Sequence, residues 1–443
     1  MTVRNIAYGE RDVTTVSADR NSHRETMMTR STASQVPDLA GTPDWRLVAG
    51  QPSAWFEAPT TSAGAELVAR ITRVAAGAPA AIDLRAGGVR VRLGAQGGAI
   101  TGEDLEVVRA VSAAARDLAL VADPAALQVV RLVIDASDRT AVLPFWRSVL
   151  GYGADCGDTL IDRLGRWPAV SFVPQDPPRP LRNRMHVDVV RVAESVTAAR
   201  EATGQVPHGP FGLALADPDG NVVDLVPGGN LGDGPETSDW RAIFGAMTHY
   251  RTDSLAQGSA LATIVATLAD EAGEPLLVDL RPDGVTIDSG KDQFEDADGG
   301  TRAAFIELAA AIQAAARGLG LSAAPDQVGF VQYGIDAVDI PATRAFWTAA
   351  LGYRLDPRAH LTDIYDPRRL NPVLFFQDID ASEEDRLRQR DRLHLELFVP
   401  DDLAPARLED ATAAGGRLVG EAPGRWTVAD PEGNELTLRT DSA

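Results

Sequence analysis

The chain carries the same series of motifs twice, about 200 residues apart. Five motifs recur in the same order in both copies: Ile-Asp-Ala (134–136, 335–337), Phe-Trp (145–146, 346–347), Leu-Gly-Tyr (150–152, 351–353), Arg-x-His-x-acid (184–188, 392–396) and Asp-Pro-x-Gly-Asn (217–221, 430–434). A repeat of this length is a duplicated group of domains rather than one unit of a solenoid. Polar residues that differ between the copies are therefore residues that the fold itself does not need.

Composition restricts the partners and the compartment. A length of 443 residues allows three or four domains. A net charge of −21 argues against nucleic acid and anionic membranes, which need a basic surface. No apolar stretch is long enough to span a bilayer, and the polar start of the chain lacks the apolar core of a secretory signal. The single cysteine, Cys156, fits a reducing cytoplasm, which is the predicted location.

Each copy has two parts, and together they predict an α+β fold. Apolar spacing and turn residues divide the chain into five segments: a flexible leader (1–36), a first part and a second part of copy one (40–125, 128–230), and the same two parts of copy two (236–325, 328–440). The first part is predicted to contain a helix, a two-stranded hairpin and a longer helix. In copy one these are 65–74, 80–84 with 89–93, and 102–118, with Thr101 and Asp104 at the spacing of a capping box. The second part of each copy is predicted to contain two successive units, each made of a strand, a helix and further strands.

The second parts resemble the glyoxalase-like branch of the vicinal oxygen chelate superfamily, through all five repeated motifs. The resemblance implies paired βαβββ units whose sheets curl around a cleft. Domains of this superfamily pack in pairs, often as homodimers. Here the pairing is expected either between the two glyoxalase-like domains of one chain or in a homodimer.

The first parts resemble pterin-4a-carbinolamine dehydratase, more weakly. The motifs are Asp-Leu-Arg (83–85), the strand 89–93 and the helix start at 98–104. The family uses histidines as general acid and base. The positions that would hold them, 78–81 and 95 in copy one and 273–276 in copy two, contain no histidine. We therefore expect structural or interaction modules, with retained pterin dehydration as a minor alternative.

The resemblance to the chelate superfamily implies one divalent metal ion held by four side chains, with substrate oxygens completing its coordination. In the first glyoxalase-like domain the matching positions are Gln128, one residue of 169–173, His186 and Asp224. In the second domain they are Gly329, 372–376, His394 and Thr437, of which only the histidine is a good ligand. The candidate metal ligands are therefore Gln128, His186 and Asp224. The histidine is present in both copies, including copy two, which has no other good ligand, so its presence does not require a metal ion. The first prediction is therefore that no cofactor is bound.

Aromatic residues on the predicted strands are the other candidate binding groups. The candidate substrate-binding residues are Trp167, Phe172, His186, Phe211, Phe376, His394 and Trp426, although core packing explains the aromatic residues equally well. The favoured function is small-molecule binding, such as sequestration of a natural product or an antibiotic, by a protein whose catalytic sites have eroded. The alternative is a metal-dependent lyase, isomerase or dioxygenase that acts at the first glyoxalase-like domain. A structural protein with filled clefts is a third possibility.

Overall fold

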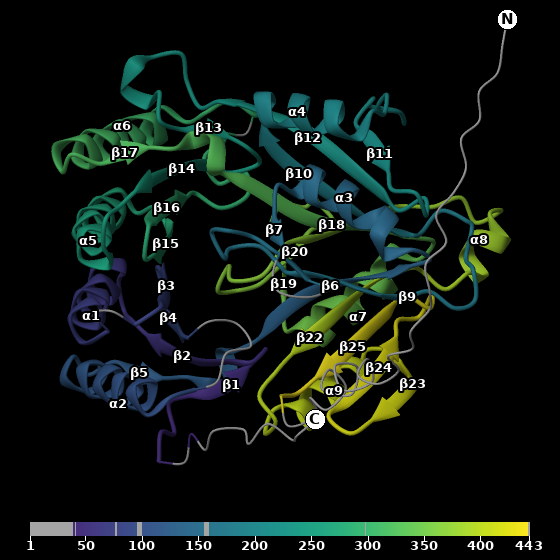
Figure 1. Cartoon of the computed structure of the whole chain (residues 1–443), viewed down its shortest axis with the longest axis horizontal. Helices are drawn as coiled ribbons and strands as arrows, with labels where there is room; N and C mark the ends of the chain where they lie inside the picture. Colours follow the sequence, from purple (N-terminus) through teal and green to yellow (C-terminus); the bar gives the residue numbers. More distant parts are fainter. Residues whose placement is uncertain are drawn as a thin grey trace, which may run out of the picture. The chain divides into compact units, whose positions relative to one another are not determined.

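The computed structural model describes residues 39, 41–75, 78–94, 100–154, 159–296 and 298–441 (Figure 1). The predicted leader and Cys156 lie outside these residues. No helix in these ranges is long and apolar enough to cross a membrane.

The first parts of the two copies join into one antiparallel sheet. The strands of copy one are β1 (Arg46–Val48), β2 (Gln51–Glu57), β3 (Ala80–Arg85), β4 (Gly88–Leu93) and β5 (Val121–Ala122). The strands of copy two are β13 (Arg241–Ala242), β14 (Ala246–Arg251), β15 (Leu277–Arg281), β16 (Gly284–Asp288) and β17 (Ser322–Ala323). Strand β3 pairs with β15, so the order β2-β4-β3-β15-β16-β14 runs through both copies (Figure 1).

Four helices cover this sheet: α1 (Thr61–Val74), α2 (Gly102–Asp117), α5 (Leu255–Ala272) and α6 (Ala303–Gly318). Helix α1 packs against α5, and one apolar core contains residues of both copies. The predicted helices and hairpin of copy one are confirmed. The capping box is confirmed too: the Thr101 hydroxyl accepts the backbone N–H of Asp104, and the Asp104 carboxylate accepts that of Thr101.

Buried charges hold the junction between the copies. Asp83 and Asp279 face each other in the β3–β15 ladder, and each belongs to an Asp-Leu-Arg motif. Arg85 reaches across to Asp279 at 2.8 Å, and Arg281 reaches across to Asp83 at 2.7 Å. Arg90 adds a second contact to Asp83 at 2.6 Å. Because every one of these side chains is buried, each charge depends on its partners for stabilisation.

The second parts contain the helices and strands that the motifs predict. Copy one has β6 (Val129–Ala136), α3 (Arg139–Leu150), β7 (Gly153–Ala154), β8 (Thr159–Ile161), β9 (Val170–Pro174), β10 (Met185–Val192), α4 (Ala193–Thr203), β11 (Ala214–Ala216) and β12 (Val222–Asn230). Copy two has β18 (Gly329–Ala337), α7 (Ile340–Leu351), β19 (Arg354–Leu355), β20 (Ile364–Tyr365), β21 (Leu374–Asp378), α8 (Glu384–Arg388), β22 (Leu393–Phe398), α9 (Ala404–Ala413), β23 (Arg417–Ala422), β24 (Arg425–Ala429) and β25 (Glu435–Arg439). Short 3₁₀ turns at Pro124–Ala126, Pro235–Thr237 and Pro325–Gln327 join the parts.

Each sheet of the second parts combines strands of both copies. Strand β22 of copy two pairs with β6 of copy one, within an eight-stranded sheet of the order β23-β24-β25-β22-β6-β9-β8-β7. Strand β10 of copy one pairs with β18 of copy two, with β12 and β21 on either side. The three predicted ligands of the first domain, Gln128, His186 and Asp224, are therefore divided between two sheets. The second parts of the two copies therefore pair within one chain, and each sheet is built from both of them.

The repeated Asp-Pro-x-Gly-Asn turn is anchored to the helix that precedes it in the chain. The Asp217 carboxylate accepts the backbone N–H groups of Asp219 and Asn221 and, at 2.8 Å, the indole N–H of Trp146 in α3. Copy two repeats the contact, from Trp347 to Asp430 at 3.0 Å. The repeated Phe-Trp motif thus fixes the helix to the hairpin as well as filling the core.

We expect Trp146→Phe to lower the free energy of unfolding by about 1–3 kcal/mol, because it removes a donor from a buried carboxylate and leaves part of the indole volume unfilled. Trp426→Phe is the matched control, since the Trp426 indole N–H donates only to the exposed Glu421, at 3.3 Å. Urea denaturation of both variants measures the difference. Equal losses in the two variants would contradict a role for the Asp217 contact.

Candidate metal centre

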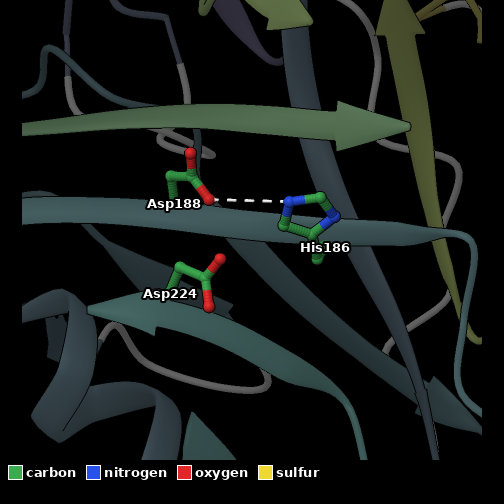
Figure 2. Close-up of side chains that lie close together, drawn as sticks. All are labelled: His186, Asp188 and Asp224. Atoms are coloured by element: carbon green, nitrogen blue, oxygen red, sulfur yellow. Dashed lines mark ion pairs between the residues drawn. The ribbon is translucent and has the colours of Figure 1, made fainter. Parts of the chain in front are cut away.

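Three ligand-type side chains converge on one face of the β10–β18 sheet. His186 and Asp188 are two residues apart on β10 and therefore point to the same face. Asp224 lies beside Asp188 on the parallel neighbour β12. One nitrogen of His186 and one oxygen of each carboxylate lie within 4.8 Å of one another (Figure 2). The distance from His186 Nε2 to Asp188 Oδ1 is 3.7 Å.

A glycine on the neighbouring strand gives the imidazole its position. Gly334 of β18 faces His186 in the ladder, and a Cβ atom at residue 334 would lie 2.2 Å from the imidazole Cε1. The ring thus lies flat against the β18 backbone. Phe375 of β21 contacts the imidazole edge-on, with ring centroids 5.5 Å apart, and also lies beside Gly334. In copy one the position of Gly334 is held by Val133, so this space belongs to one cleft only.

Neighbouring polar groups orient the cluster. Asp336 lies 3.8 Å from His186 Nδ1 and is itself bound to Arg386 and to the amide of Gln377. The Gln332 amide donates to Asp188 Oδ2 at 2.8 Å. Metal-binding histidines in proteins commonly have such a carboxylate behind them, because it fixes the ring orientation.

Several polar atoms of the cluster are buried without a hydrogen bond. They are Asp188 Oδ1, His186 Nδ1 and Gln332 Oε1. The half-buried Asp224 carboxylate forms no hydrogen bond or ion pair with any residue that the structure describes. Burial raises the pKa of Asp188, and the Asp224 charge raises it further, against lowering by His186 and Gln332. Two carboxylates and an imidazole suit a divalent cation of the Mn²⁺ to Zn²⁺ series, and such an ion would satisfy Asp188 Oδ1.

Lys291 lies near the cluster, in the segment that follows β16. Its ammonium group binds the Asp363 carboxylate and lies 5.9 Å from the ring centres of Phe244 and Phe375. The charge of Lys291 also lowers the pKa of Asp188. The first part of copy two therefore supplies a cation to this cleft.

The other cleft, on the β22–β6 sheet, has the same histidine but different neighbours. His394 lies 3.6 Å from Asp135, as His186 lies beside Asp336. Glu396 replaces Asp188, and Arg439 and Arg131 lie 3.0 and 3.9 Å from it. Thr437 occupies the position of Asp224. Since the arginines already neutralise the only carboxylate at the ligand positions, this arrangement does not suit a metal ion. Burial lowers the pKa of His394, so this imidazole is neutral near pH 7.

Of the three predicted ligands, the structure brings together His186 and Asp224 but not Gln128. Gln128 precedes β6 in the other sheet, where its amide donates to the backbone oxygen of Leu351 at 2.9 Å. Its inclusion with the other two was wrong because it assumed that β6 and β10 share a cleft, whereas β10 pairs with β18.

The predicted aromatic binding residues lie mainly in the core or at the surface. Phe172 and Phe376 face the helices within the apolar core, and Trp426 packs against the same core. Phe211 lies in a turn and is 83% exposed, because β11 begins only at Ala214. These four placements differ from the predicted cleft lining. Trp167 is half-buried at the edge of the cleft region, and its indole donates to the Gly329 oxygen at 2.8 Å.

Asp188, Gln332 and Gly334 were not predicted as site residues, although the sequence contains features that point to them. Asp188 follows His186 by two positions, which places both on one face of any strand. Gln332 stands where copy one has Arg131, and Gly334 stands where it has Val133. Both differences fall on the strand that faces His186.

The comparisons with known proteins agree with the motifs. Residues 131–226 and 332–439 match the family model of the glyoxalase-like domain. No curated protein sequence matches the chain. Solved structures that match include glyoxalase I from Zea mays, at 12% identity and a TM-score of 0.32 over 71% of this chain and 93% of that one. A variant of the same enzyme matches at 10% identity and a TM-score of 0.33, over 71% and 94%.

The family match leaves 40–125 and 236–325 uncovered, so the resemblance of these segments to the pterin dehydratase stays a prediction. The two matched segments contain every residue of the cluster and of its counterpart in the other cleft. Two segments of the chain, 131–226 and 332–439, are therefore similar to the glyoxalase-like domain.

Proposed function

We propose that the chain binds a divalent metal ion through His186, Asp188 and Asp224 and uses it to hold the oxygen atoms of a small molecule. The observation that carries this proposal is the convergence of three donors within 4.8 Å, on a face where buried oxygen and nitrogen atoms lack partners. The sequence favoured metal-free binding of a small molecule over metal-dependent activity, and this proposal places the metal-dependent function first. The metal-dependent alternative becomes the first choice, at a site composed of both copies.

Charge supports an ion at this site. Asp188 and Asp224 lie side by side, and neither forms an ion pair with an arginine or lysine among the described residues. Two adjacent carboxylates in a partly buried site repel each other unless one is protonated or a cation lies between them. The cleft of His394 lacks this excess of negative charge, although it shares the fold.

The chain's own residues would bind and orient the reactants. Asp336 would hold the His186 ring, and Gln332 would hold Asp188, so the ligand atoms need little rearrangement. Phe375 would exclude water from one side, and Lys291 would balance negative charge on bound oxygen atoms. A bound divalent metal supplies Lewis-acid stabilisation of developing negative charge, the chemistry expected of a lyase, isomerase or dioxygenase of this superfamily.

Metal analysis of the purified chain tests the proposal. We expect about one divalent ion per chain after purification without chelator, and at least tenfold weaker binding in His186→Ala and Asp188→Asn, because each removes a ligand. Metal content by mass spectrometry and titration of metal-depleted protein give the two measurements. His394→Ala is the matched control and should keep its metal. Equal metal content in all four proteins, or none in any, would refute the metal site.

A second function is supported for the β22–β6 cleft. There Glu396 is held by Arg131 and Arg439, and His394 is neutral. These groups suit metal-free binding of a small polar molecule, which is the sequestration that the sequence favoured. Its test is small-molecule binding that survives chelation and is lost in His394→Ala.

The first parts act, in this proposal, as structural modules that supply groups such as Lys291. His249, their only described histidine, is buried on β14 and bonded to the Thr286 hydroxyl at 2.9 Å. Burial lowers its pKa to about 4. A histidine that stays neutral and enclosed is a poor general acid near pH 7, which argues against pterin dehydration.

A further inference from the structure

A hollow of about 410 Å³ lies apart from the residues of the metal site. Its walls come from β2, from the turn between β3 and β4, from the segment after β16 and from the loop that follows β20. Three of the four domains of the chain therefore meet around it. Its volume falls in the range of pockets that bind small molecules.

Positive charge dominates the lining of this hollow. Its charged residues are four arginines and one glutamate: Arg85, Arg354, Arg368, Arg369 and Glu57. Arg85 is neutralised by Asp279 at 2.8 Å, and Arg368 by Asp123 at 2.7 Å. Arg354 and Arg369 form no ion pair with any carboxylate of the described residues. Two guanidinium groups outside any ion pair of the described residues are unusual in a chain with a net charge of −21.

Both free arginines lie beside one tyrosine ring. The guanidinium of Arg369 lies 3.8 Å from the ring centre of Tyr365, and Arg354 is the ladder partner of Tyr365 in the β19–β20 hairpin. Arg369 is half-buried, and burial lowers its pKa. An oxyanion bound to Arg369 would compensate the hydration that its guanidinium group loses on burial.

The backbone of Arg369 is also strained, and the duplication shows that the turn does not require an arginine. Arg369 has φ +53°, in the left-handed region that glycine adopts freely. The same turn in copy one places Gly165 there, with φ +59°. Asp162 and Asp366 each fix their turn by accepting backbone N–H groups, so the two turns are built alike. Copy two thus has a residue with a strained backbone at the position whose side chain lines the hollow.

We propose that this hollow is a second binding site, which takes a small organic anion by its phosphate or carboxylate group between Arg354 and Arg369. The planar guanidinium groups present paired N–H donors that match both kinds of oxyanion. The site is independent of the metal ion, because none of its lining residues belongs to the metal centre.

Calorimetric titration of the full-length, metal-depleted chain tests the proposal, with inorganic pyrophosphate in one arm and succinate in the other. We expect saturable binding of at least one of them, and the arm that binds tells phosphate from carboxylate. Arg369→Gly should weaken that binding at least tenfold, and Arg354→Gln should weaken it several-fold. Added salt should weaken it as well.

Thermal unfolding separates lost binding from lost folding. Arg369→Gly restores the residue of copy one and removes backbone strain, so its Tm should equal or exceed that of the natural chain. Arg147→Ala, which removes an exposed arginine of α3, should leave anion binding unchanged. Failure of the natural chain to bind either anion, or undiminished binding by Arg369→Gly, would overturn the proposal.

Discussion

Asp83→Asn should lower the free energy of unfolding by about 3–5 kcal/mol, the cost of breaking a buried ion pair from one side. The substitution keeps the shape of the side chain and removes only its charge. Arg90 and Arg281 would then remain buried, 2.6 and 2.7 Å from a neutral group. Since Asp83 lies in the ladder that joins the two copies, the loss should appear in the cooperative unfolding of the whole sheet. Urea denaturation at pH 7 measures it.

The pH dependence of the free energy of unfolding is a second measurement that tests this prediction. Burial by itself raises the pKa of Asp83, but the surrounding arginines, chiefly Arg90 and Arg281, lower it more, so that the pKa lies well below its usual range. A carboxyl with a lowered folded-state pKa contributes stability above its unfolded pKa, about 3.9, and loses that contribution as the pH falls further. The stability of Asp83→Asn should therefore fall less between pH 5 and pH 3 than that of the natural chain.

An exposed aspartate provides the control for both measurements. Asp298→Asn removes the same charge from the surface and should change stability by no more than about 0.5 kcal/mol. A loss in Asp83→Asn as small as this would mean that the arginines find other partners, and the charge network would then not hold the junction.

Much of the fold follows from local patterns in the sequence. Thr101 and Asp104 fixed the start of a helix, and Gly151, with φ +72°, ended another where the motif predicted. Such signals depend on residues within one turn of each other, so one sequence is enough to read them. The turn at 217–221 was placed correctly for the same reason.

Strand partners could not be read in this way. Both β6 and β18 are apolar strands with similar patterns, and no local feature shows whether β10 pairs with β6 of its own copy or with β18 of the other. The choice rests on long-range packing. This single uncertainty explains the misplacement of Gln128. It also hid the part played by Gln332 and Gly334, which face Asp188 and His186 only because β10 pairs with β18.

Side-chain direction accounts for the aromatic residues. Phe375 and Phe376 are neighbours on β21, and one-residue alternation sends the first to His186 and the second to the core. Without the exact register, either residue was an equal candidate. Asp188 was within reach of the sequence, since its spacing from His186 fixes a common face in any register.

Gln332→Arg should weaken divalent metal binding by about 100-fold, a large effect for a residue next to the ligands. The two clefts suggest the experiment. Gln332 faces Asp188 in the β10–β18 ladder, just as Arg131 faces Glu396 in the β22–β6 ladder. An arginine at 332 would place a permanent charge beside Asp188 and neutralise it, as the arginines neutralise Glu396. The cleft would then resemble its counterpart, which offers no cation site.

A glutamate at the same position separates charge from shape. Gln332→Glu matches the natural side chain in size and adds a negative charge, so metal affinity should be kept or increased, whereas a purely steric effect would weaken binding in both variants. Titration of metal-depleted protein gives the affinities, and thermal unfolding checks that each variant folds. Because Gln332 donates to Asp188 Oδ2 at 2.8 Å, the glutamate variant loses one hydrogen bond in the metal-free state and should regain stability when metal is added. If Gln332→Arg leaves the metal affinity unchanged, the ion does not lie between Asp188 and Asp224. These two carboxylates would then not be metal ligands.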